Sequence, residues 1–110
     1  MGCRLHVAKT YKVEYDKADF NHLQKQINQL LSDICPSVCW NGNETNYSND
    51  MEISREELKR GIKLLRNGMN DKEFLHYKID GYSRTEVADI LEQFLNEADP
   101  DNDFVKLFWF

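Results

Sequence analysis

The stretch Phe104-Val105-Lys106-Leu107-Phe108-Trp109-Phe110 (FVKLFWF) is the part of this 110-residue sequence that most strongly constrains its fold. Side chains of a strand alternate between two faces. One face of this stretch carries two aliphatic side chains and an indole, those of Val105, Leu107 and Trp109. The other face is aromatic apart from one lysine, and holds Phe104, Phe108 and Phe110 around Lys106. An edge strand rarely needs two apolar faces, so we expect this strand at the centre of a sheet.

The opening segment shows the same alternation. Its odd-numbered positions, apart from Lys9, are apolar: Leu5, Val7, Tyr11, Val13 and Tyr15. The polar residues lie at even-numbered positions: Arg4, His6, Thr10, Lys12 and Glu14. This alternation predicts one long strand with a single buried face. We expect this strand to pair with 104–110 in the middle of the sheet.

A helical stripe follows over residues 19–34. Its apolar positions recur at three- and four-residue steps and are Phe20, Leu23, Ile27, Leu30, Leu31 and Ile34. Asp16 or Asp19 is available to cap its start, and Pro36 ends it because a proline ring cannot continue the hydrogen-bond ladder.

Three further helices begin with the same device, a capping side chain three residues before a glutamate. The pairs are Ser54 with Glu57, Asn70 with Glu73, and Ser83 with Glu86. Gly68 and Gly81 stand where a C-terminal cap needs positive φ. The first two helices have short buried stripes, Leu58, Ile62 and Leu65, then Phe74, Leu75 and Ile79. The last has the clearest apolar arc, formed by Val87, Ala88, Ile90, Leu91, Phe94, Leu95 and Ala98.

Between the first and second helices the pattern is weak. Ser37–Trp40 and Met51–Ile53 are short strand candidates, and Asn41-Gly42 is typical of a tight turn. The conformation of residues 41–50 stays open. The order of elements predicts an α+β fold in one domain, 1–110: two layers, with a small antiparallel or mixed sheet built mainly from the N- and C-terminal strands and about four helices packed on it.

Composition narrows the classes of partner. Fourteen bases against 19 acids give a net charge of −5, which disfavours direct binding to nucleic-acid phosphates. No apolar run approaches the roughly 18 residues that span a membrane. The first residues lack the apolar core of a secretion signal, and three cysteines do not make a disulfide framework, so a cytoplasmic location is expected.

Candidate chemical sites are weak. A zinc site from Cys35 and Cys39 with Cys3 and His6 is disfavoured, because residues 3 and 6 of a strand point to opposite faces. Asp99, Asp101 and Asp103 match the start of a calcium-binding loop, but Phe104 stands where that loop needs glycine. The three histidines are scattered and no nucleophile signature surrounds a serine or cysteine. We therefore predict no metal, no cofactor and no catalytic residue, and lean against an enzyme.

The strongest charge feature is a run from Glu86 to Asp103 without Lys or Arg. Its acids include Glu86, Asp89, Glu92, Glu97, Asp101 and Asp103. Such a surface attracts a basic partner, and it also serves simply to keep the protein in solution. The leading hypothesis is a small acidic, non-catalytic binding protein, of inhibitor, immunity or adaptor type, that engages a basic protein through these residues.

Two alternatives stay open. One is a small-molecule-binding domain or small enzyme with its site near Cys39, Trp40 and Tyr47. The other is an obligate homo-oligomer that buries the aromatic face of Phe104, Phe108 and Phe110 between copies.

Overall fold

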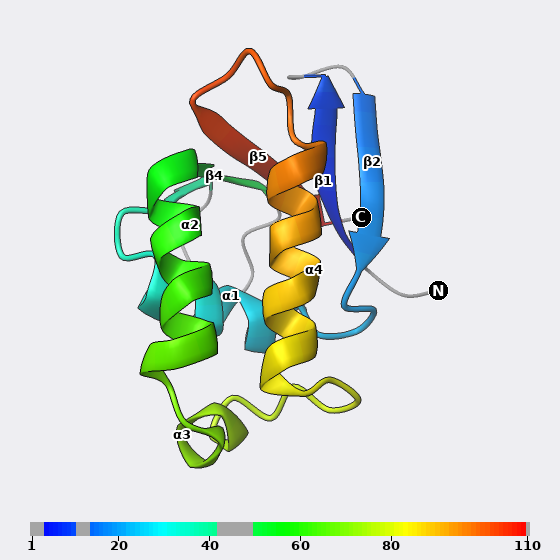
Figure 1. The fold of residues 1–110 in the computed structure, drawn as a ribbon. Coiled ribbons are helices and arrows are strands. Elements are labelled where there is room, and N and C mark those ends of the chain that lie inside the picture. Colours follow the sequence, from blue (N-terminus) through cyan, green and yellow to red (C-terminus); the bar gives the residue numbers. More distant parts are fainter. Residues whose placement is uncertain (1–3, 11–13, 42–49, 110) are drawn as a thin grey trace.

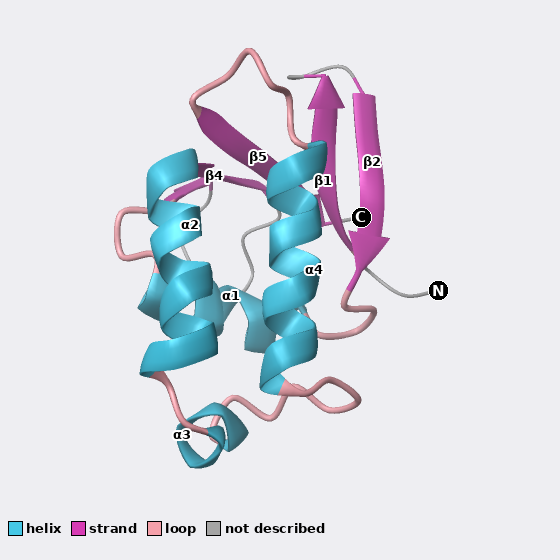
Figure 2. Ribbon diagram, viewed as in Figure 1, coloured by secondary structure: helices cyan, strands magenta, loops and turns pink. Residues whose placement is uncertain are grey.

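The computed structural model describes residues 4–10, 14–41 and 50–109. The strands are β1 (Leu5–Thr10), β2 (Glu14–Asp19), β3 (Cys39–Asn41), β4 (Asp50–Ser54) and β5 (Phe104–Trp109). The helices are α1 (Gln24–Ile34), α2 (Arg55–Lys63), α3 (Asp71–Leu75) and α4 (Arg84–Glu97). One wider, π-helical turn, η2 (Leu64–Gly68), continues α2. Four helices and a sheet confirm the α+β prediction (Figures 1 and 2).

All neighbouring strands are antiparallel, in the order β2-β1-β5-β4-β3. The last strand of the chain is therefore central, as its two-faced apolar pattern predicts. It pairs with β1 on one side, where Val7 lies opposite Leu107. It pairs with β4 on the other, where Ile53 lies opposite Val105.

Helices α2 and α4 lie side by side in front of one face of the sheet, while the short α3 lies beyond the end of α2 that points away from β5 (Figure 1). The core face of β5 is fully buried, as predicted, through Val105, Leu107 and Trp109. The Trp109 indole donates to Asn28 Oδ1 of α1 at 2.8 Å inside this core. Helices α1 and α2 approach closely at Gly61, where a Cβ atom would lie 2.9 Å from Cys35 Sγ. The result is the predicted two-layer arrangement.

The opening segment is not one long strand, and that prediction is wrong. Strands β1 and β2 pair antiparallel, so the chain reverses between them, and residues 11–13 lie outside the described part. The covering helix explains the limit on length. Helix α4 has 14 residues and spans about 21 Å, which matches the ~20 Å of six strand residues in β1. A strand twice as long would extend past its cover.

The first helix begins later than its apolar stripe. Phe20 and His22 have φ of 61° and 66°, which is left-handed backbone, so the helix starts at Gln24. Asp19 does not cap it: its Oδ1 accepts from Phe20 N at 3.1 Å and from the Tyr82 hydroxyl at 2.6 Å. The predicted end before Pro36 is confirmed, because α1 stops at Ile34.

The later helices follow the predicted caps with three differences. Asn70 and Ser83 form complete capping boxes, but Ser54 accepts only from Glu57 N, because the Glu57 carboxylate accepts from Ser37 N instead, at 2.6 Å. Gly81 has the predicted positive φ, 88°, whereas Gly68 lies inside η2. Leu75 is exposed rather than buried, since the five-residue α3 has room for one inward position, Phe74.

Candidate protein-binding surface

The two faces of α4 are as predicted, except that Ile90 of the predicted apolar arc is only half-buried and packs at the margin of the core. The buried face holds Val87, Ala88, Leu91, Phe94 and Leu95, followed by Ala98 just beyond the helix. Among the predicted partner-binding acids, Glu86, Asp89, Glu92, Asp101 and Asp103 are exposed and Glu97 is half-buried. The acids form two groups, one along α4 and one at its C-terminal end.

The acids along α4 are partly neutralised, although the run 86–103 itself contains no Lys or Arg. Arg66 of η2 donates to Asp89 Oδ1 at 2.8 Å and to Glu92 Oε1 at 2.9 Å. Glu86 caps its own helix by accepting from Ser83 N at 2.9 Å. Because α2 and η2 pack beside α4, a base distant in sequence reaches this face. Arg66 therefore forms an ionic bridge between η2 and α4.

The turn after α4 is held by Arg55 at the start of α2. Its guanidinium donates to the Leu95 carbonyl at 3.1 Å, to the Asn102 carbonyl at 2.7 Å, and to the Asp99 carbonyl. Leu95 is in the last turn of α4, where carbonyls lack intrahelical partners and carry the negative end of the helix dipole. Arg55 N also donates to the Asp103 carbonyl at 2.9 Å. A single arginine thus fixes the path of residues 95–103.

The aspartates of this turn act as turn residues. Asp99 Oδ1 accepts from Asp101 N at 3.0 Å, and Asn102 Oδ1 accepts from Phe104 N at 2.9 Å. These bonds are the short-range side-chain bonds that stabilise tight turns. Neither bond uses the carboxylate of Asp101 or Asp103, and both residues are exposed.

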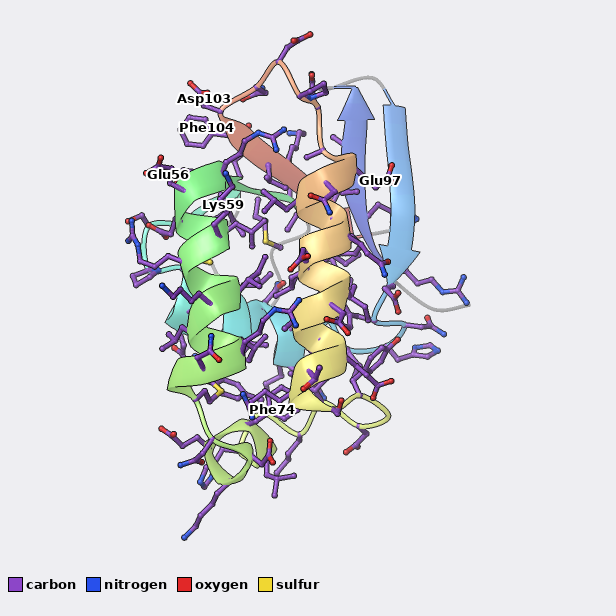
Figure 3. All side chains as sticks on the ribbon, viewed as in Figure 1. Glu56, Lys59, Phe74, Glu97, Asp103 and Phe104 are labelled. Carbon is purple, nitrogen blue, oxygen red and sulfur yellow. The ribbon has the colours of Figure 1, made fainter. Side chains whose placement is uncertain are left out.

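We define the acidic end as Phe104 with Glu56, Glu97, Asp101 and Asp103. Phe104 is 44% exposed and lies beside Asp103, above Glu56 at the start of α2, while Glu97 lies at the adjacent end of α4 (Figure 3). Within the described part of the chain, none of these four carboxylates forms an ion pair. Arg55 and Lys59 bring two positive charges to this end, and the four acids outnumber them.

The predicted aromatic face of β5 is only partly exposed. Phe108 is half-buried, and Phe110 lies outside the described residues. Between the two phenylalanines of this face, Lys106 Nζ lies 3.2 Å from Asp50 Oδ2 of β4, with both side chains largely buried. Of the two phenylalanines of this face that the structure describes, Phe104 is therefore the one that a partner can reach more directly.

The alternative site near Cys39 is not assembled by the described residues. Cys39 is exposed, the side chain of Trp40 is not described, and Tyr47 lies outside the described residues. Cys35, in contrast to Cys39, is fully buried in the hydrophobic core. Burial, and then the charge of Glu57, raise the pKa of the Cys35 thiol to about 12.

Sequence reasoning missed two contributors to the acidic end, Glu56 and Arg55. Both are in the first turn of α2, more than 40 residues before the turn that they adjoin. A Ser-Arg-Glu-Glu run signals a helix start, and nothing local in it indicates where the arginine points.

Comparison of the chain with family models, with curated proteins and with solved structures finds no match. Among the described helices, none combines the length and apolar character needed to cross a membrane. In the same part of the chain, no three or more His, Cys, Asp or Glu side chains group closely enough to hold a metal ion.

Proposed function

We propose that this chain is a small acidic binding protein that engages a basic protein partner through the acidic end, in the manner of an inhibitor, immunity protein or adaptor. The observation that carries the proposal is Phe104, a large aromatic side chain 44% exposed beside carboxylates that no described base pairs. An aromatic anchor surrounded by a polar rim is the usual composition of a protein interface hot spot.

The backbone under this surface supports the role because it is held from two sides. Phe104 begins the central strand, opposite Ser54 of β4. The preceding turn is fixed by the Arg55 hydrogen bonds. An interface on a preorganised backbone loses less conformational entropy on binding than a mobile loop does.

The charge distribution favours a basic partner. Asp89 and Glu92 already form ion pairs with Arg66, so they contribute less binding energy to a basic partner. Glu97, Asp101 and Asp103, which form no ion pair with any described base, contribute more. The proposed contact is therefore narrower than the whole 86–103 run. Exposed acids of this kind mainly increase the rate of association with a basic partner, and salt weakens this attraction by screening the charges.

The test compares tagged wild-type protein with variants in affinity capture from the native host, quantified by mass spectrometry. Asp103→Lys and Phe104→Ser each alter the acidic end. Asp80→Lys makes the same charge change at an exposed residue beyond α3, at the other end of the molecule. We expect one basic protein to be enriched by wild type and by Asp80→Lys, and at least about tenfold less by the other two variants.

Binding of the purified partner should also weaken as salt is raised. Equal enrichment by all the variants would contradict the proposal, as would an acidic partner. Recovery of nothing except further copies of this chain would favour the homo-oligomer instead.

A further inference from the structure

A groove lies between α1 and the segment 69–78 around α3. Helix α3 is at the end of the molecule away from the acidic end (Figure 1). Its volume is about 600 Å³, within the range typical of small-molecule sites. Its lining combines the charged and apolar side chains Lys25, Asp33, Met69, Glu73, Tyr77 and Lys78 with the polar side chains Gln26, Gln29 and His76.

One wall of the groove is held rigidly by a hydrogen-bonded pair. The Tyr77 hydroxyl donates to Asp33 Oδ2 at 2.6 Å, and Gln29 Nε2 donates to Asp33 Oδ1 at 3.2 Å. Burial, and then this bond to Asp33, raise the pKa of Tyr77, so its hydroxyl stays protonated and remains a donor. Helix α1 and the α3 segment are thus joined across the groove before any ligand arrives.

The charges of the groove are not equally available to a ligand. Asp33 accepts the two bonds from Gln29 and Tyr77, and Glu73 Oε1 accepts from Asn70 N at 3.2 Å in the α3 capping box. Lys25 and Lys78 are exposed, and neither forms an ion pair with any described residue. Each ammonium carries three hydrogen-bond donors. Asp33 and Glu73 keep their negative charge, but these hydrogen bonds occupy part of their acceptor capacity, whereas both ammonium groups still offer their donors to a ligand.

Lys78 is held in an unusual backbone conformation, with φ of 56°. A lysine with left-handed backbone is uncommon and costs energy, and such residues concentrate at functional sites. Met69 and the half-buried ring of Tyr77 pack on the hydrophobic core and supply apolar surface in the groove.

We propose that this groove binds a small organic anion with a flat apolar portion. Lys25 and Lys78 hold the carboxylate, and the apolar part lies against Met69 and the Tyr77 ring. The inference is independent of the protein-binding proposal, since the two surfaces share no residue.

Three probes with one ring system separate charge from apolar contact: 2-naphthoate, neutral 2-naphthylmethanol and cationic 2-naphthylmethylamine. Each is titrated into the full chain labelled with ¹⁵N, and backbone amide shifts are followed by NMR. We expect 2-naphthoate to shift the amides of Gln29, Met69 and Tyr77 and to bind at least about fivefold more tightly than the neutral probe. The amine should bind most weakly.

Lys25→Gln and Lys78→Asn each remove one ammonium, and asparagine tolerates left-handed backbone. Each should weaken 2-naphthoate at least about threefold while leaving the neutral probe unchanged. Lys63→Gln, an exposed lysine of α2, is the control for general charge and should change neither. Lys78→Gly replaces Lys78→Asn if the asparagine variant does not fold.

Three results would overturn the proposal. They are the absence of amide shifts in the groove at millimolar 2-naphthoate, tighter binding of the amine than of 2-naphthoate, and unchanged affinity for 2-naphthoate in both lysine variants.

Discussion

At the scale of single residues, Glu57 shows how tertiary contacts redirect a local motif. Its position three residues after Ser54 suits a capping box, yet its carboxylate accepts from Ser37 N, at the end of the α1 region. Only 8% of Glu57 is exposed. One buried carboxylate therefore joins the start of α2 to the chain that leaves α1, and it also lies near the Cys35 thiol.

Cys35 and Cys39 should differ in reactivity by their surroundings alone. Burial, and then the charge of Glu57, raise the pKa of the Cys35 thiol to about 12, so its thiolate is scarce at neutral pH. We expect iodoacetamide to modify Cys39 and spare Cys35 in the folded protein, and to modify both in urea. Tandem mass spectrometry assigns the sites. Equal modification of both in the folded state would contradict this placement of Cys35.

At the scale of elements, the end of α4 depends on α2. The carbonyls that α4 cannot satisfy within itself receive Arg55, whose guanidinium also fixes the turn before β5. The same arginine therefore completes a helix and positions the carboxylates of the acidic end.

Replacing Arg55 by alanine should loosen the turn without unfolding the protein. Loss of hydrogen bonds from a charged donor costs about 1.5–3 kcal/mol, so amides of residues 98–103 should exchange faster with deuterium. Hydrogen–deuterium exchange with mass spectrometry measures this. Arg60→Ala, an exposed residue of the same helix, is the control and should leave exchange in that segment unchanged. Unchanged exchange in Arg55→Ala would show that the turn is held by its own side-chain bonds.

At the scale of the whole molecule, the central strand β5 joins the two halves of the sheet and contacts the helix layer. Among the described residues, Trp109 is the largest fully buried side chain, and its indole nitrogen donates to Asn28, 81 residues away in the sequence. Asn28 itself is fully buried. This bond therefore ties α1 to the middle of the sheet.

Asn28→Ala should destabilise the entire fold, since it leaves a buried indole N–H without its acceptor. The free energy of unfolding should fall by about 1–3 kcal/mol, measured by urea denaturation. Asn96→Ala, the same change at an exposed position of α4, should alter stability by less than about 0.5 kcal/mol. Equal stability of the two variants would show that Trp109 finds another acceptor.

Regular patterns in the sequence predicted most of the framework. The two apolar faces of 104–110 predicted the central position of β5, and the apolar arc of 87–98 predicted the buried face of α4. These features depend on neighbours at fixed short spacings, so they are readable from the chain. Prediction from local patterns was wrong at two places where the backbone changes direction. One is the reversal between β1 and β2, and the other is the left-handed backbone of Phe20 and His22 before α1.

By itself, the sequence determined the layers, the central strand and an acidic stretch ending in an aromatic strand. Only the tertiary structure decided which acids remain available, because Arg66 reaches Asp89 and Glu92 through the packing of η2 beside α4. It also placed Glu56 and Arg55 at the acidic end. The physical reason is that an ion pair needs its charges within a few ångströms, and between residues more than 20 positions apart that distance is set by helix packing rather than by sequence spacing.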